Sequence, residues 1–109
     1  MNRRPQISKA RLESLVEEAT VDAYDEAEQA GGFFTMVEEN LDVPFSTVVL
    51  GVEVTVKRIY MTEGDEIVAV CGRGKESQRI SILDLPLPSP LPEGAEWIAA
   101  YRYWRRCGR

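Results

Sequence analysis

The chain has 109 residues and a formal net charge of −5, and 44% of its residues are hydrophobic. These values predict one folded domain over residues 1–109 and exclude wholesale disorder. No apolar run approaches the ~20 residues of a membrane span, and no apolar stretch follows the basic N-terminus, so we expect a cytoplasmic protein without a membrane partner.

Two helices are predicted in the first 45 residues. Apolar residues recur at helical spacing behind Ser8, a residue type that caps helix N-termini; they are Leu12, Leu15, Val16 and Ala19. A second apolar stripe follows and ends before Pro44, because proline disfavours the helical conformation in the residue that precedes it. The members of this second stripe are Ala23, Ala27, Ala30, Phe34, Val37 and Leu41.

Gly31 and Gly32 interrupt the second helical pattern. Each glycine inside a helix costs about 1 kcal/mol relative to alanine, so the pair requires a structural reason. We expect another element to pack closely against the bare backbone here; the alternative is a kink in the helix.

From Ser46 onward the apolar period changes from 3.6 to two, which indicates β-strands. Alternating valines begin at Val52, and turns are predicted at residues 63–65 and 72–75. Four or five short strands at intervals of about 8–12 residues are typical of a small, strongly bent antiparallel sheet or barrel. We therefore predict an SH3-like barrel over residues 46–85.

The C-terminal part is predicted to be a linker followed by a helix. Residues 86–92 are rich in proline and favour a stiff extended linker, with a ligand for an SH3-type partner as the alternative. In a last helix over residues 93–109, the rings of Trp97, Tyr101 and Trp104 share one stripe, and their burial is strongly favourable. The predicted fold class is thus α+β, with two N-terminal helices (residues 1–45), a barrel and a C-terminal helix docked on it.

Missing residue types and the charge distribution narrow the function classes. The chain has no histidine, which excludes Ser-His and Cys-His catalysis and histidine-based zinc sites. Carboxylates remain as possible catalysts or ligands, and we expect a binding protein that is not an enzyme. Cys71 and Cys107 are expected to be free thiols, since nothing else indicates export. Residues 1–44 carry ten acidic residues against four basic ones, which favours cations over nucleic acid as partners.

The densest acidic group lies at the start of the second predicted helix. On a helix, one stripe would hold Asp22, Asp25, Glu26 and Gln29. Like charges at this spacing repel, and a hard cation would turn that repulsion into binding, because calcium prefers several carboxylate oxygens. The alternative is that these acids stabilise the helix dipole or form a solvated face.

One helical turn cannot complete a calcium shell, so a second segment must contribute. The sequence offers Glu39 and Asp42 at the far end of the helix, or an acidic turn. That turn holds Glu63, Asp65 and Glu66. An EF-hand loop is absent from the sequence.

Two stretches carry a distinctive pattern. They are residues 21–33, Val-Asp-Ala-Tyr-Asp-Glu-Ala-Glu-Gln-Ala-Gly-Gly-Phe, and residues 41–45, Leu-Asp-Val-Pro-Phe. With these stretches and the closing Tyr103-Trp104, the chain resembles the calcium-binding protein family typified by the cyanobacterial calcium-binding protein. The resemblance implies a bacterial, non-EF-hand protein that binds calcium through acidic side chains. By implication the candidate metal ligands are Asp22, Asp25, Glu26 and Glu28.

We therefore predict a small monomeric protein that binds calcium through clustered carboxylates. The alternative is a protein–protein interaction adaptor built on an SH3-like barrel, which would hold a protein partner and no metal. A nucleic-acid binder is disfavoured, because no aromatic residues are spaced through the strands for base stacking and the basic cluster is short. That cluster consists of Arg102, Arg105, Arg106 and Arg109.

Overall fold

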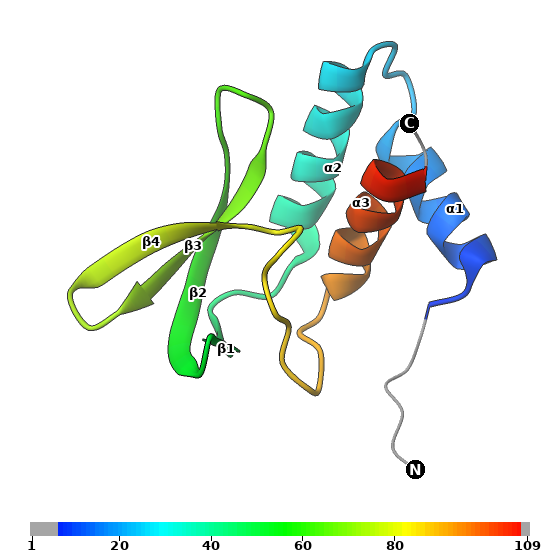
Figure 1. Ribbon diagram of the computed structural model, residues 1–109. Helices are drawn as coiled ribbons and strands as arrows, with labels where there is room; N and C mark the ends of the chain where they lie inside the picture. The colour runs from blue at the N-terminus through cyan, green and yellow to red at the C-terminus, as the bar shows by residue number, and fades with distance from the viewer. Residues whose placement is uncertain (1–6, 108–109) are drawn as a thin grey trace.

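The computed structural model describes residues 7–107, with side chains up to Arg106 (Figure 1). The helices are α1 (Lys9–Ala19), α2 (Glu26–Asn40) and α3 (Ala95–Cys107), and the strands are β1 (Phe45–Val49), β2 (Val52–Met61), β3 (Ile67–Arg73) and β4 (Glu76–Ser81). The predicted α+β class and the order of helices and strands are confirmed. None of the described helices combines the length and the apolar character that a membrane span needs.

Helix α1 begins at the predicted cap. Ser8 has an extended backbone, and its hydroxyl accepts a hydrogen bond from the backbone N–H of Arg11 at 3.1 Å. The buried side chains of this helix are Leu15 and Ala19, two members of the stripe predicted from the sequence. This stripe packs against α2 and α3.

Close packing at the glycine pair is confirmed for one of the two residues. A Cβ atom at Gly32 would overlap the carbonyl oxygen of Ala19, which belongs to the last turn of α1. A Cβ atom at Gly31 would meet nothing within 4 Å. The backbone of α2 therefore crosses the end of α1 directly at Gly32, where no side chain fits.

The sheet is an open antiparallel meander, not the predicted SH3-like barrel (Figure 1). The four strands neighbour each other in chain order, so β1 and β4 are free edges. Helix α2 packs against β2, and the inner face of β2 and β3 joins the hydrophobic core with Phe33 and Val37. Because α2 covers the apolar face, the sheet need not close on itself. A period of two in the sequence is the same for an open sheet and for a barrel.

Helix α3 docks on the other two helices, and the prediction that it docks on a barrel is wrong. Its aromatic stripe is nevertheless buried as expected, since Trp97, Tyr101 and Trp104 are each at most 5% exposed. The ring centres of Tyr101 and Trp104 lie 5.5 and 5.1 Å from that of Phe33 on α2. An amphipathic stripe predicts that a helix is docked, but it does not identify the apolar surface that receives it.

The segment between β4 and α3 is held by hydrogen bonds to β1 and to α3. The hydroxyl of Thr47 donates to the carbonyl oxygen of Pro86 at 2.6 Å. Arg102 of α3 donates from Nε to the Ile82 carbonyl at 2.8 Å and from Nη2 to the Leu85 carbonyl at 2.6 Å. Burial lowers the pKa of the Arg102 guanidinium. Arg102 thus has a structural role, which removes it from the basic cluster considered for nucleic acid.

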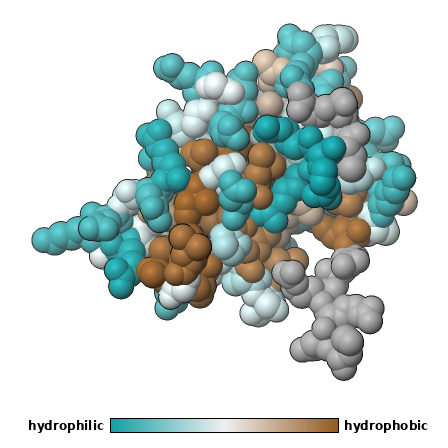
Figure 2. Space-filling view, in the orientation of Figure 1, coloured by the Kyte–Doolittle hydropathy of each residue, from teal (hydrophilic) through white to brown (hydrophobic). Residues whose placement is uncertain are grey.

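The sheet also carries an exposed apolar hairpin and a buried thiol. Val48, Leu50 and Val52 are exposed at the β1–β2 hairpin, and Figure 2 shows an apolar area in the region where Figure 1 places this hairpin. Cys71 on β3 is a free, buried thiol as predicted, and burial raises its pKa, which disfavours the thiolate form. The side chain of Cys107 lies outside the described part of the chain.

Candidate metal centre

The acidic segment before α2 does not form the predicted helical stripe. Asp22 has a φ of 63° in the turn after α1, and Asp25 is the N-cap residue, so the helix begins only at Glu26. Aspartate side chains bind backbone groups outside helices, which makes them preferred caps rather than interior residues. For this reason helical periodicity placed the start of α2 too early.

Asp25 and Glu28 hold the first turn of α2 together. An Oδ1 atom of Asp25 accepts a hydrogen bond from the backbone N–H of Glu28 at 2.8 Å. In return, Oε1 of Glu28 accepts one from the backbone N–H of Tyr24 at 2.7 Å. This reciprocal arrangement is similar to a capping box. Both carboxylates therefore have a structural role at the positive end of the helix dipole.

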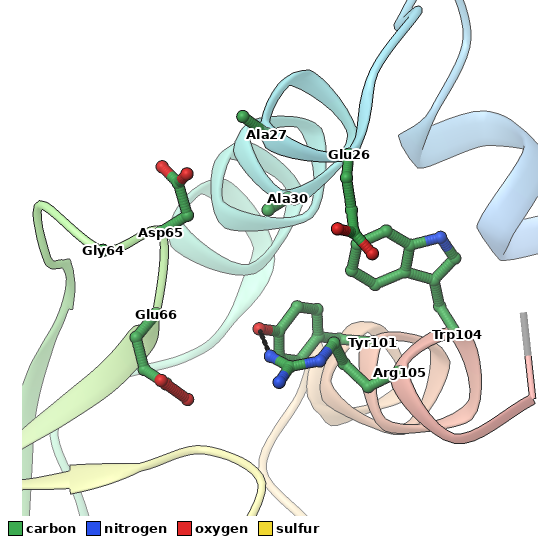
Figure 3. A pocket seen from close by; sticks show the side chains of 9 residues that line it. All are labelled: Glu26, Ala27, Ala30, Gly64, Asp65, Glu66, Tyr101, Trp104 and Arg105. Carbon is green, nitrogen blue, oxygen red and sulfur yellow. Dashed lines mark hydrogen bonds between the residues drawn. The ribbon is translucent and has the colours of Figure 1, made fainter. Parts of the chain in front are cut away.

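Glu26 lines a pocket of about 190 Å³ that three elements enclose (Figure 3). Helix α2, the turn between β2 and β3, and the C-terminal half of α3 each contribute to its wall. The lining residues are Glu26, Ala27, Ala30, Gly64, Asp65, Glu66, Tyr101, Trp104 and Arg105. The structure thus brings one of the four predicted ligands to the acidic turn that the sequence offered as a second segment.

The other candidate second segment lies elsewhere. Glu39 and Asp42 flank the C-terminal end of α2 and line a separate cavity together with Glu93 and Glu96. Helix α2 has 15 residues, which corresponds to a length of about 22 Å at the standard rise per residue. These two carboxylates therefore cannot share an ion with Glu26.

The pocket contains a cationic side chain beside its carboxylates. Nη1 of Arg105 donates a hydrogen bond to the Tyr101 hydroxyl at 2.7 Å, and its guanidinium lies 5.7 Å from the centre of the Tyr101 ring. Figure 3 shows the guanidinium reaching from α3 toward the Tyr101 hydroxyl, with Glu26 and Glu66 on either side of it in this view. The guanidinium therefore lies in a pocket that carboxylates also line.

The carboxylates of the pocket are not gathered around one point. Among residues 7–107, no three Asp, Glu or Cys side chains lie close enough together to hold a metal ion. The donor set nevertheless suits calcium, because calcium accepts carboxylates, carbonyls and water in irregular shells. A bound ion would require Glu26, Asp65 and Glu66 to turn inward and the guanidinium to move away.

Comparisons with known proteins decide the family. A family model described as calcium binding, CcbP, matches residues 13–105. The chain belongs to the CcbP family. This result confirms the resemblance seen in the sequence, and the matched range extends from α1 nearly to the end of α3. No curated protein matches the chain.

Two solved structures are similar in fold to this chain over most of its length. One, described as a calcium binding protein in the calcium-binding form, has a TM-score of 0.71 at 20% identity and covers 89% of this chain and 90% of its own. The other, the crystal structure of Anabaena CcbP, has a TM-score of 0.71 at 19% identity and covers 97% of this chain and 98% of its own. Such coverage indicates that the helices and the open sheet occur together in these proteins.

Arg105 is the pocket residue that sequence analysis did not recognise. It was grouped with the other C-terminal arginines, although it follows Tyr101 by four residues, which is one helical turn. A cation next to the aromatic stripe that docks the helix must lie at the edge of a buried surface. The four-residue spacing between Tyr101 and Arg105 could therefore have indicated that Arg105 lies beside the buried aromatic stripe.

Proposed function

We propose that this protein binds calcium in the pocket between α2, the β2–β3 turn and α3. The observation that carries the proposal is that carboxylates from a helix and from a distant turn, Glu26, Asp65 and Glu66, line one cavity. Membership of the calcium-binding CcbP family supports the choice of ion. Water would complete the shell, as in many calcium sites without an EF-hand loop.

We consider Asp22, Asp25 and Glu28 weaker candidates for calcium ligands than Glu26, Asp65 and Glu66. Asp25 and Glu28 already accept hydrogen bonds from backbone N–H groups, so their use by a metal would weaken the cap of α2. Asp22 lies in the turn after α1, three residues before the N-cap. Their participation stays a prediction. The SH3-like barrel of the adaptor alternative is absent, because the described sheet is open.

Arg105 is the counter-charge of the pocket when calcium is absent. Its guanidinium occupies the side of the cavity that α3 forms, and a divalent cation entering the same space would be repelled by it. Calcium binding therefore includes an exchange of one cation for another. In this account calcium draws the carboxylates of α2 and the turn together, while Arg105 moves toward solvent.

Single substitutions in the acidic turn test the location of the site. Asp65→Asn and Glu66→Gln each remove a charge and keep the shape, and asparagine tolerates the positive φ of 64° at position 65. We expect each variant to weaken calcium binding by about tenfold or more in calorimetric titrations, because each removes a charged ligand.

Glu63→Gln is the matched control, since Glu63 belongs to the same turn but does not line the pocket. It changes the net charge equally and should alter the affinity by less than about twofold, because exposed charges at a distance are screened by salt. If all three variants lost calcium affinity equally, the loss would reflect only the change in net charge, and the proposed site would be contradicted.

A further inference from the structure

The face of the sheet that points away from the helices carries two arginines around one tyrosine. Arg58 and Tyr60 lie on β2, and Arg79 lies on β4. The guanidinium carbons of Arg58 and Arg79 are 5.9 and 4.8 Å from the centre of the Tyr60 ring. In the sheet register Val70 of β3 pairs with Arg58 on one side and with Arg79 on the other. Directly paired residues share a face, so both arginines extend over the same residue.

The packing beneath these side chains holds them in place. Val68 and Val70 are only 7% and 9% exposed although they lie outside the main core cluster, to which the alternate residues of β3 belong. Their cover on this face must come from their register neighbours, which include Tyr60, Arg58 and Arg79. Arginine stems commonly cover apolar surface in this way while the charged heads stay in water. The stems of both arginines therefore lie on the sheet, and their guanidiniums lie beside the Tyr60 ring.

The positive charge of this face is not neutralised within the described part of the chain. Among the described residues, the ion pair is between Arg11 of α1 and Glu96 of α3. On the outer face of the sheet, no carboxylate lies within 4.0 Å of Arg58, of Arg79 or of the adjacent Lys57. Two guanidiniums near one ring repel each other, and an anion placed between them would remove that repulsion.

We infer that this outer face, formed by Arg58, Tyr60 and Arg79, docks a short acidic segment of a partner protein. Guanidinium groups bind carboxylates through two parallel hydrogen bonds, which gives both affinity and orientation. Residues on β2 and β4 are about 10 Å apart across β3, a span that carboxylates two or three residues apart in an extended peptide can match. The inference does not depend on the calcium site.

Acidic residues at both ends of β2 limit the width of a ligand that lies across the strands. Glu53 lies near the start of the strand, and Glu63 follows its end. A wide polyanion such as a nucleic acid would come close to these charges and be repelled, whereas a narrow extended peptide would fit between them. The charge pattern therefore favours a protein segment over nucleic acid.

A fluorescein-labelled hexaglutamate peptide, titrated by fluorescence anisotropy at ~50 mM salt, serves as the probe. We expect Arg58→Gln/Arg79→Gln to weaken binding by about tenfold or more, because two charge-assisted contacts are lost. Arg73→Gln/Lys75→Gln removes the same charge from the β3–β4 hairpin and should change binding by about twofold or less. Arg58→Lys/Arg79→Lys keeps the charge but loses the planar fork, so a loss of about threefold or more is expected.

Three results would overturn the inference. The first is no saturable binding of the peptide by the unsubstituted protein. The second is an equal loss in the two glutamine double variants, which would show non-specific attraction. The third is tighter binding of a single-stranded oligonucleotide or of anionic lipid vesicles, measured under the same conditions.

Discussion

Replacing Gly32 with alanine should destabilise the protein by about 1–3 kcal/mol, the usual range for overpacking a tight contact. The added Cβ atom would overlap the carbonyl oxygen of Ala19, and a backbone atom cannot rotate out of the way as a side chain can. To make room, α1 must move away from α2. Because α3 packs against both helices, the movement also disturbs the aromatic contacts of the C-terminal helix.

Gly31→Ala is the matched control, and we expect it to raise the free energy of unfolding where Gly32→Ala lowers it. Nothing lies within 4 Å of a Cβ atom at this position, so alanine adds no clash and raises helix propensity by about 0.5–1 kcal/mol. Urea unfolding of the three proteins measures both effects. If Gly32→Ala were no less stable than Gly31→Ala, the direct contact between the backbones of α1 and α2 would be contradicted.

Arg105→Gln should tighten calcium binding by about tenfold, because the substitution removes a cation that competes for the same carboxylates. The variant also loses the hydrogen bond from Nη1 to the Tyr101 hydroxyl. A small loss of stability in the calcium-free protein, about 0.5–1.5 kcal/mol, is therefore expected alongside the gain in affinity. The two effects have opposite directions, which separates competition for the pocket from general damage to the fold.

Arg106→Gln provides the comparison for this experiment. Arg106 is the next residue on α3, is exposed and does not line the pocket, so it reports the effect of net charge alone. The calcium affinity of the Arg106→Gln variant should stay within about twofold of that of the unsubstituted protein, since exposed charges are screened by salt. Equal gains for Arg105→Gln and Arg106→Gln, or no gain for either, would show that Arg105 is not the counter-charge of the pocket.

The sequence predicted most helices and strands but not how the layers meet. Ser8 and the change of period near Pro44 were sufficient to locate α1, the end of α2 and the first strand. The barrel was wrong, because alternation of apolar residues reports which face is buried and not whether β1 meets β4. The docking of α3 on α1 and α2 was also not predicted, because the apolar stripe of a helix shows that it is buried but not against which surface.

The candidate site was predicted in parts that only the fold could join. Glu26 and the turn around Asp65 were both identified from their charge, and so was the far end of α2, which the structure places in another cavity. Asp25 was assigned to the helix because helical spacing cannot distinguish a cap from the first turn. The position of Arg105 in the pocket depends on α2, the β2–β3 turn and α3 lying next to each other. Local sequence patterns carry no information on such long-range contacts.

Titration of the chelator-treated protein with calcium, followed by magnesium, tests the proposed function most directly. We expect saturable heat of binding and a rise in melting temperature with calcium, because a ligand that binds only the folded state stabilises it. Magnesium should give a much smaller effect, since it requires near-octahedral geometry and gives up its water reluctantly. Absence of saturable binding, together with an unchanged melting temperature at millimolar calcium, would contradict a calcium site in this protein.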